Sequence, residues 1–143
     1  MLYMKKEIII QAPVEMVFSA FKHIPNLVPT DDHLLSITII SQVKEGVGVQ
    51  TEWKVKNPDD SLKIWREEIT GYQENKLVEF KTLGDKLMTG KLTFTSIEKG
   101  THILFEETEH YEGGTTPERK AWGMETQLQG MKNYYEEKVK ESE

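Results

Sequence analysis

The chain has 143 residues, of which 37% are hydrophobic and 29% are charged, and its formal net charge at pH 7 is −6. This length and composition are typical of one globular domain with a sizeable core, and they exclude a disordered chain. The absence of cysteine excludes disulfide bonds and thiolate metal sites, and the negative charge without any local basic patch argues against nucleic acid as a partner.

No apolar run approaches the ~18 residues that a membrane-spanning helix needs. No apolar stretch of signal-peptide length follows Met1. We therefore expect a cytoplasmic protein without stable membrane insertion. Residues 1–143 contain no linker, repeat or low-complexity tract, so a single domain is predicted.

The first part of the chain predicts a strand followed by a helical interruption. Met4–Gln11 ends in a β-branched run that is typical of a buried strand. Apolar residues at helical spacing then predict a short helix over Pro13–Lys22. Pro25 and Pro29 restrict the next segment to a second short helix or a loop, which ends near Asp32.

The rest of the chain predicts six more strands and a long helix. Alternating apolar and polar residues, separated by short polar turns, are typical of an antiparallel meander. The predicted strands are Leu35–Ile39, Val49–Lys56, Leu62–Thr70, Leu77–Leu83, Leu87–Ile97 and Thr101–Tyr111. After a glycine pair, a threonine cap, a proline in the first turn and an apolar stripe predict a helix over Pro117–Lys140.

The order of these elements predicts a pocket. A sheet of seven strands is much wider than one helix, so it must curl around the helix to bury its inner face. A curled sheet around a helix often leaves unfilled volume, and concave volume lined by apolar groups is typical of ligand sites.

Several short motifs stand in a characteristic order along the chain. A strand meets Ala-Pro and a Val-Phe helix at Ile10–Phe18, and a glycine turn occupies Gly46–Gly48. Glu67–Ile69 and Leu77–Phe80 come next, and Gly100–Ile103 precedes the last strand. In this order the motifs resemble the START-like SRPBCC superfamily, which includes lipid-transfer proteins, polyketide cyclases and aromatases, and activators of a heat-shock chaperone.

The resemblance covers nearly the whole chain and implies a fold and a cavity, whereas a fold does not fix a function. The fold it implies is the α+β helix-grip fold. In it, a curled seven-stranded antiparallel sheet surrounds a long C-terminal helix, and two short helices lie between the first two strands.

The last strand carries candidate catalytic groups. If Ile103 and Phe105 face inward, alternation places Glu107, Glu109 and Tyr111 on the same concave face. Carboxylates there suit a cation, a hydroxyl or amine of a ligand, or the work of a general base. At a solvated cavity mouth, or after a β-bulge, they would have no such role.

Glu67 is the third candidate carboxylate, and its orientation depends on the register of strand 62–70. Pairing Trp53 opposite Trp65 places Trp65 and Glu67 inside. A slip by one residue would instead turn the alternate residues inward, namely Ile64, Arg66 and Glu68. We favour the first register, because it unites two tryptophans on one face and matches the superfamily's Glu-x-Ile pattern.

Apolar and aromatic residues of the strands and of the helix stripe are candidate walls of the pocket, although each of them suits core packing equally well. The predicted ligand-binding set is Trp53, Trp65, Glu67, Phe80, Met88, Leu92, Phe94, Phe105, Glu107, Glu109, Tyr111, Met124, Leu128 and Met131. Its methionines suit an adaptable surface that accepts irregular apolar shapes.

The histidines predict no metal site. The segment from His23 to His33 also carries Asp31 and Asp32, but its spacing is no recognised ligand pattern, so we interpret it as a solvated loop. His102 and His110 alternate with the inward set and are expected to face outward. No metal and no cofactor is predicted.

We expect a protein that binds or transports a small hydrophobic or amphipathic molecule, and a ligand with a polar or cationic group fits the glutamates. Two alternatives stay open: a polyketide cyclase- or dehydratase-like enzyme with Glu67, Glu107 or Glu109 as general base, and a chaperone-activator-like interaction protein. The lack of a convincing catalytic set favours binding over catalysis. The sequence does not determine the oligomeric state, and a homodimer is compatible with it.

Overall fold

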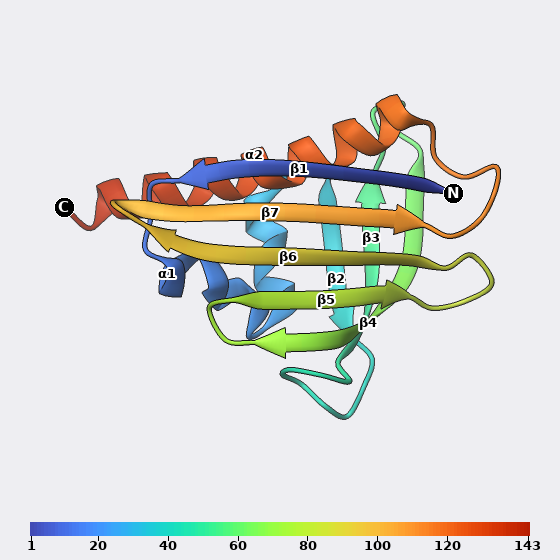
Figure 1. Cartoon of the computed structure of the whole chain (residues 1–143), viewed down its shortest axis with the longest axis horizontal. Helices are drawn as coiled ribbons and strands as arrows, with labels where there is room; N and C mark the ends of the chain where they lie inside the picture. The colour runs from blue at the N-terminus through green and yellow to red at the C-terminus, as the bar shows by residue number, and fades with distance from the viewer.

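Seven antiparallel strands form one continuous sheet in the computed structural model, which describes residues 1–143 (Figure 1). The strands are β1 (Leu2–Ile10), β2 (Leu34–Ile39), β3 (Gln50–Lys56), β4 (Leu62–Gln73), β5 (Leu77–Thr82), β6 (Met88–Ile97) and β7 (Gly100–Glu109). Their order across the sheet is β1-β7-β6-β5-β4-β3-β2, so β2 to β7 form the predicted meander and β1 pairs with the last strand.

The helices differ more from the prediction than the strands do. The predicted helix over Pro13–Lys22 is divided into α1 (Val14–Phe18) and the 3₁₀ turn η1 (Ser19–Phe21). The next segment is a 3₁₀ helix, η2 (Ile24–Thr30). It contains two prolines, which lack the N–H groups that an α-helix needs, and this favours the short 3₁₀ form.

The long C-terminal helix α2 (Pro117–Glu141) begins where the sequence predicts and ends one residue later than predicted. The Thr116 hydroxyl accepts a hydrogen bond from the Arg119 N–H at 3.3 Å and so caps its first turn. Figure 1 shows α2 running along the inside of the curled sheet, next to β1.

Two strands extend two or more residues beyond a predicted end. β1 begins at Leu2 instead of Met4. β4 continues to Gln73 instead of ending at Thr70, because the register shifts between Ile69 and Gly71 and this irregularity interrupts the pattern of alternating residues.

One end of the concave face is closed by an aromatic core. The ring centroid of Phe18 in α1 lies 5.1 Å from that of Phe94 in β6, and the centroid of Phe21 lies 5.4 Å from the same ring. Both pairs are edge-on, the packing that aromatic rings favour. Because α1 and η1 fill this end, Phe94 is covered and does not line the cavity described below.

Two glycines of α2 provide a test of this packing. A methyl group on Gly130 would overlap the backbone carbonyl oxygen of Thr30 in η2, whereas a methyl group on Gly123 would meet nothing within 4 Å. We expect Gly130→Ala to lower the free energy of unfolding by about 1–3 kcal/mol through overpacking. Gly123→Ala is the matched control and should raise it by up to ~1 kcal/mol, because alanine is the better helix former. Urea denaturation measures both, and equal effects would contradict the close contact between α2 and η2.

Candidate ligand-binding cavity

A cavity of about 780 Å³ lies between the concave face of the sheet and the N-terminal half of α2. This volume is within the range of ~300–1,000 Å³ that is typical of small-molecule sites. Its most exposed lining residues lie beside the β3–β4 turn, in the β5–β6 turn and in the first two turns of α2, so the mouth is there; they are Lys56, Lys63, Asp85, Lys86, Thr116 and Gly123.

Most of the predicted ligand-binding set lines this cavity. These residues are Trp53, Trp65, Glu67, Phe80, Met88, Leu92, Glu107, Glu109, Tyr111 and Met124. The other four are a correction, because the structure buries them in the core outside the cavity; they are Phe94, Phe105, Leu128 and Met131. Alternation places a side chain on the concave face, but it does not tell which end of that face is filled.

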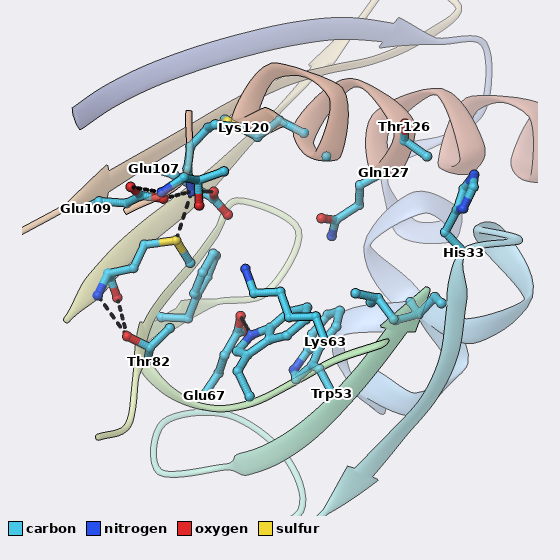
Figure 2. Close-up of a pocket in the computed structure, with 18 of the residues that line it drawn as sticks. His33, Trp53, Lys63, Glu67, Thr82, Glu107, Glu109, Lys120, Thr126 and Gln127 are labelled. Atoms are coloured by element: carbon cyan, nitrogen blue, oxygen red, sulfur yellow. Dashed lines mark hydrogen bonds and ion pairs between the residues drawn. The ribbon is translucent and has the colours of Figure 1, made fainter. Parts of the chain in front are cut away.

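The structure has the first of the two registers of β4. Trp53 is paired with Trp65, and their rings stack with centroids 5.7 Å apart. Glu67 therefore faces inward and is buried, whereas Ile64 on the other face of the strand is 55% exposed. The same alternation turns Lys63 toward the concave face (Figure 2).

Glu67 is a buried carboxyl group with one neutral partner. The Trp65 indole N–H donates to its Oε2 at 2.6 Å, and no lysine or arginine forms an ion pair with it. Burial raises the pKa of Glu67 to about 8, against the lowering effect of the Trp65 hydrogen bond. At pH 7 the group is therefore mainly protonated and can donate one hydrogen bond into the cavity.

The two glutamates of β7 share a buried lysine from α2, as Figure 2 shows. Lys120 Nζ lies 2.8 Å from Glu107 Oε1, 3.0 Å from Glu109 Oε2 and 3.2 Å from Met88 Sδ. These contacts use all three donors of the ammonium group. Glu109 Oε1 also accepts a hydrogen bond from the Thr115 N–H at 3.1 Å.

The pKa values of this cluster follow from burial and from the shared charge. Burial raises the pKa of Glu107 even though Lys120 opposes the shift. For Glu109 the burial effect is outweighed by the hydrogen bonds from Lys120 and Thr115, so its pKa is lowered. Burial alone would lower the pKa of Lys120, but the two glutamates raise it.

The sequence prediction missed Lys120 and Lys63, although the signal was available for both. Lys120 precedes Met124 by four residues and so lies on the same helical stripe, and Lys63 precedes Trp65 by two on the concave face of β4. Residue type concealed them, since lysines are rarely buried unless they are paired, as Lys120 is, and are mostly exposed, as Lys63 is.

The segment before β2 needs a correction. His33 and Asp31 line the rim of the cavity instead of lying in a solvated loop, because the His33 ring packs edge-on against Trp122 with centroids 4.8 Å apart. His23 and Asp32 are exposed, as predicted. No group of three or more His, Cys, Asp or Glu side chains is arranged to hold a metal ion.

The two C-terminal histidines lie on the outer face, as predicted. His102 Nε2 is 2.7 Å from Glu7 Oε1 on β1, and His110 Nε2 is 2.8 Å from Thr89 Oγ1 on β6. Neither residue lines the cavity, so neither forms an acid–base pair with Glu107.

The sequence matches no protein-family model and no curated protein. Solved structures do match. A protein from Thermus thermophilus superposes with a TM-score of 0.76 at 20% identity, over 92% of this chain and 95% of the other. The major latex-like protein 151 from Panax ginseng superposes with a TM-score of 0.76 at 13% identity, over 94% and 97%. The chain has the START-like helix-grip fold.

The same helix-grip fold occurs in the di-domain ARO/CYC protein StfQ of the steffimycin biosynthetic pathway. StfQ superposes with a TM-score of 0.76 at 15% identity, over 96% of this chain and 52% of its own length. At such identities the likeness shows the fold and leaves the function open. None of the helices of this helix-grip chain is both long and apolar enough to cross a membrane.

Proposed function

We propose that this helix-grip protein binds a small amphipathic molecule in the cavity between its sheet and α2. The observation that carries the proposal is the cavity itself, about 780 Å³ in volume. Trp53, Phe80 and Leu92 contribute apolar wall, while Glu67 and the Lys120 cluster place polar groups among them. Such a distribution gives affinity through the apolar surface and orientation through the polar groups.

Gly123→Phe tests the proposal, because it fills the cavity from its rim. A side chain at this position enters open space, so the fold should tolerate it. We expect the affinity for the neutral fluorescent probe N-phenyl-naphthylamine to fall by about 100-fold, equivalent to ~2.7 kcal/mol. Fluorescence titration measures the change, and Gly123→Ala, which adds only one methyl group, should bind the probe as the wild type does.

Wild-type affinity in Gly123→Phe would place the probe outside the cavity, and the absence of saturable binding to the wild-type protein would contradict the proposed function. Native mass spectrometry of freshly purified protein complements the titration. A co-purified small molecule that is lost in Gly123→Phe would support a carrier.

Glu67 favours a second candidate function, that of a cyclase- or dehydratase-like enzyme. A protonated carboxyl group that faces a cavity is suited to general acid–base catalysis, and the ARO/CYC protein StfQ has the same fold. Glu107 and Glu109 are less suited to it, because Lys120 already contacts both. If the protein is such an enzyme, Glu67→Gln should still bind a polyketide-like substrate but no longer convert it. A binding protein would return the substrate unchanged in both forms.

A further inference from the structure

Three cationic side chains that line the cavity have no carboxylate partner. Lys63, Lys86 and Arg119 take part in none of the ion pairs of the structure. Lys63 Nζ lies 5.2 Å from the centre of the Trp65 ring, and Lys86 Nζ lies 5.9 Å from the centre of the Tyr111 ring. In a chain with a net charge of −6, unpaired cations around one opening are a local reversal of charge.

The acidic groups of the cavity do not balance these cations. Five cationic and five acidic side chains line it, namely Lys56, Lys63, Lys86, Arg119 and Lys120 with Asp31, Glu67, Asp85, Glu107 and Glu109. Glu67 is mainly protonated at pH 7, and Lys56 is paired with Asp60 at 3.4 Å. The charged groups of the cavity without an ion pair are therefore three cations, Lys63, Lys86 and Arg119, against two carboxylates, Asp31 and Asp85. Because Lys120 already occupies Glu107 and Glu109, a cationic ligand group would find no free carboxylate among them, contrary to the expectation from the glutamates alone.

The unpaired cations face one shared space. Lys63 points from β4 toward α2, as Figure 2 shows, and Arg119 lies on α2 next to Lys120. Burial, and then the neighbouring charges of Lys120 and Arg119, lower the pKa of Lys63 against the opposing effect of Glu107. An anion in this space would relieve the repulsion between the cations, whereas a neutral ligand would leave it unchanged.

We propose that the cavity selects an apolar monocarboxylate, whose carboxylate lies at the mouth between Lys63 of β4 and Arg119 of α2. Its apolar body would then extend over the stacked Trp53 and Trp65 rings. This inference rests on the proposed function and adds the charge and the orientation of the ligand.

A matched pair of probes tests the inference. Pyrenebutanoate and pyrenebutanol share one apolar body and differ in the anionic group, and both are fluorescent. We expect the wild-type protein to bind the acid about tenfold more tightly than the alcohol at pH 7, equivalent to ~1.4 kcal/mol. Lys63→Gln and Arg119→Gln should each reduce this preference, and the double variant should abolish it while the affinity for the alcohol stays the same. Lys91→Gln is the control, because this exposed lysine of β6 lies outside the cavity.

The outcomes separate the inference from the proposed function. Equal affinities of the wild-type protein for acid and alcohol would overturn the proposal of an anionic ligand. The proposed function, binding of a small molecule in the cavity, would stand. A preference that persists in the double variant would overturn the assignment to Lys63 and Arg119. Binding of neither probe would count against the cavity as a ligand site and would remove both proposals together.

Discussion

Replacing Lys120 by methionine is expected to lower the free energy of unfolding by about 3–5 kcal/mol at pH 7. The substitution removes the cation that contacts both Glu107 and Glu109, at 2.8 Å and 3.0 Å. The side chains of all three residues are at most 13% exposed, so water cannot take over the role of the lysine. Two carboxylates would be left in an apolar setting without an opposite charge, which costs far more than the loss of a surface ion pair.

Two controls separate this charge effect from the loss of packing. Lys138→Met on the same helix breaks an exposed ion pair with Glu141 and should cost less than ~1 kcal/mol. Glu109→Gln should restore part of the stability when it is combined with Lys120→Met, because it removes one of the two uncompensated charges. Urea denaturation measures all of these variants. A Lys120→Met protein as stable as Lys138→Met would contradict the charged cluster.

The loss of unfolding free energy in Lys120→Met should also depend on pH. Without the lysine, both glutamates lose an interaction that favours their charged forms, so their pKa values rise. They then take up protons more readily as the pH falls, and the difference in stability from the wild-type protein should be smaller at pH 5 than at pH 7. A difference that does not change with pH would indicate lost packing instead of uncompensated charge.

The fold was predictable because its signals are local and repeat along the chain. Each strand of the meander alternates with a period of two, and that period also gives the inward face of β4 and β7. The pairing of Trp53 with Trp65 was predictable from the length of one turn and from the advantage of uniting two large apolar side chains on one face. The stripe of Met124 and Leu128 likewise determined which face of α2 meets the sheet.

The boundaries of the cavity were not predictable, because they depend on contacts between segments far apart in the chain. Phe94 and Phe80 lie on the same concave face, yet only Phe80 lines the cavity. Phe94 is covered by Phe18 and Phe21 from α1 and η1, and no periodic pattern reports how far those helices reach over the sheet. The charge of the cavity also depends on a contact between distant segments. Glu107 and Glu109 of β7 suggest an acidic pocket until Lys120 of α2 is placed between them.

Replacing Glu67 by glutamine is expected to change the pH dependence of stability and, at high pH, to stabilise the protein. Burial raises the pKa of Glu67 from 4.5 to about 8 in the folded state. Between these pH values the folded protein holds a proton that the unfolded chain has released, so the free energy of unfolding falls as the pH rises. Each unit of pKa difference corresponds to ~1.4 kcal/mol, and the loss therefore reaches several kcal/mol. Glutamine is neutral and still accepts the Trp65 hydrogen bond, so it avoids this loss.

Urea denaturation of the wild-type protein and Glu67→Gln at pH 5, 7 and 9 measures the effect. The two proteins should be nearly equally stable at pH 5, and the variant should be the more stable one by several kcal/mol at pH 9. Glu68→Gln is the matched control, because Glu68 lies on the opposite face of β4 outside the cavity, and its stability should stay within ~0.5 kcal/mol of the wild type. A Glu67→Gln protein that is less stable than the wild type at pH 9 would mean that the carboxylate is charged and stabilised in the fold. Glu67 would then offer a ligand only acceptors, and the hydrogen-bond donor assigned to it in the cavity would be wrong.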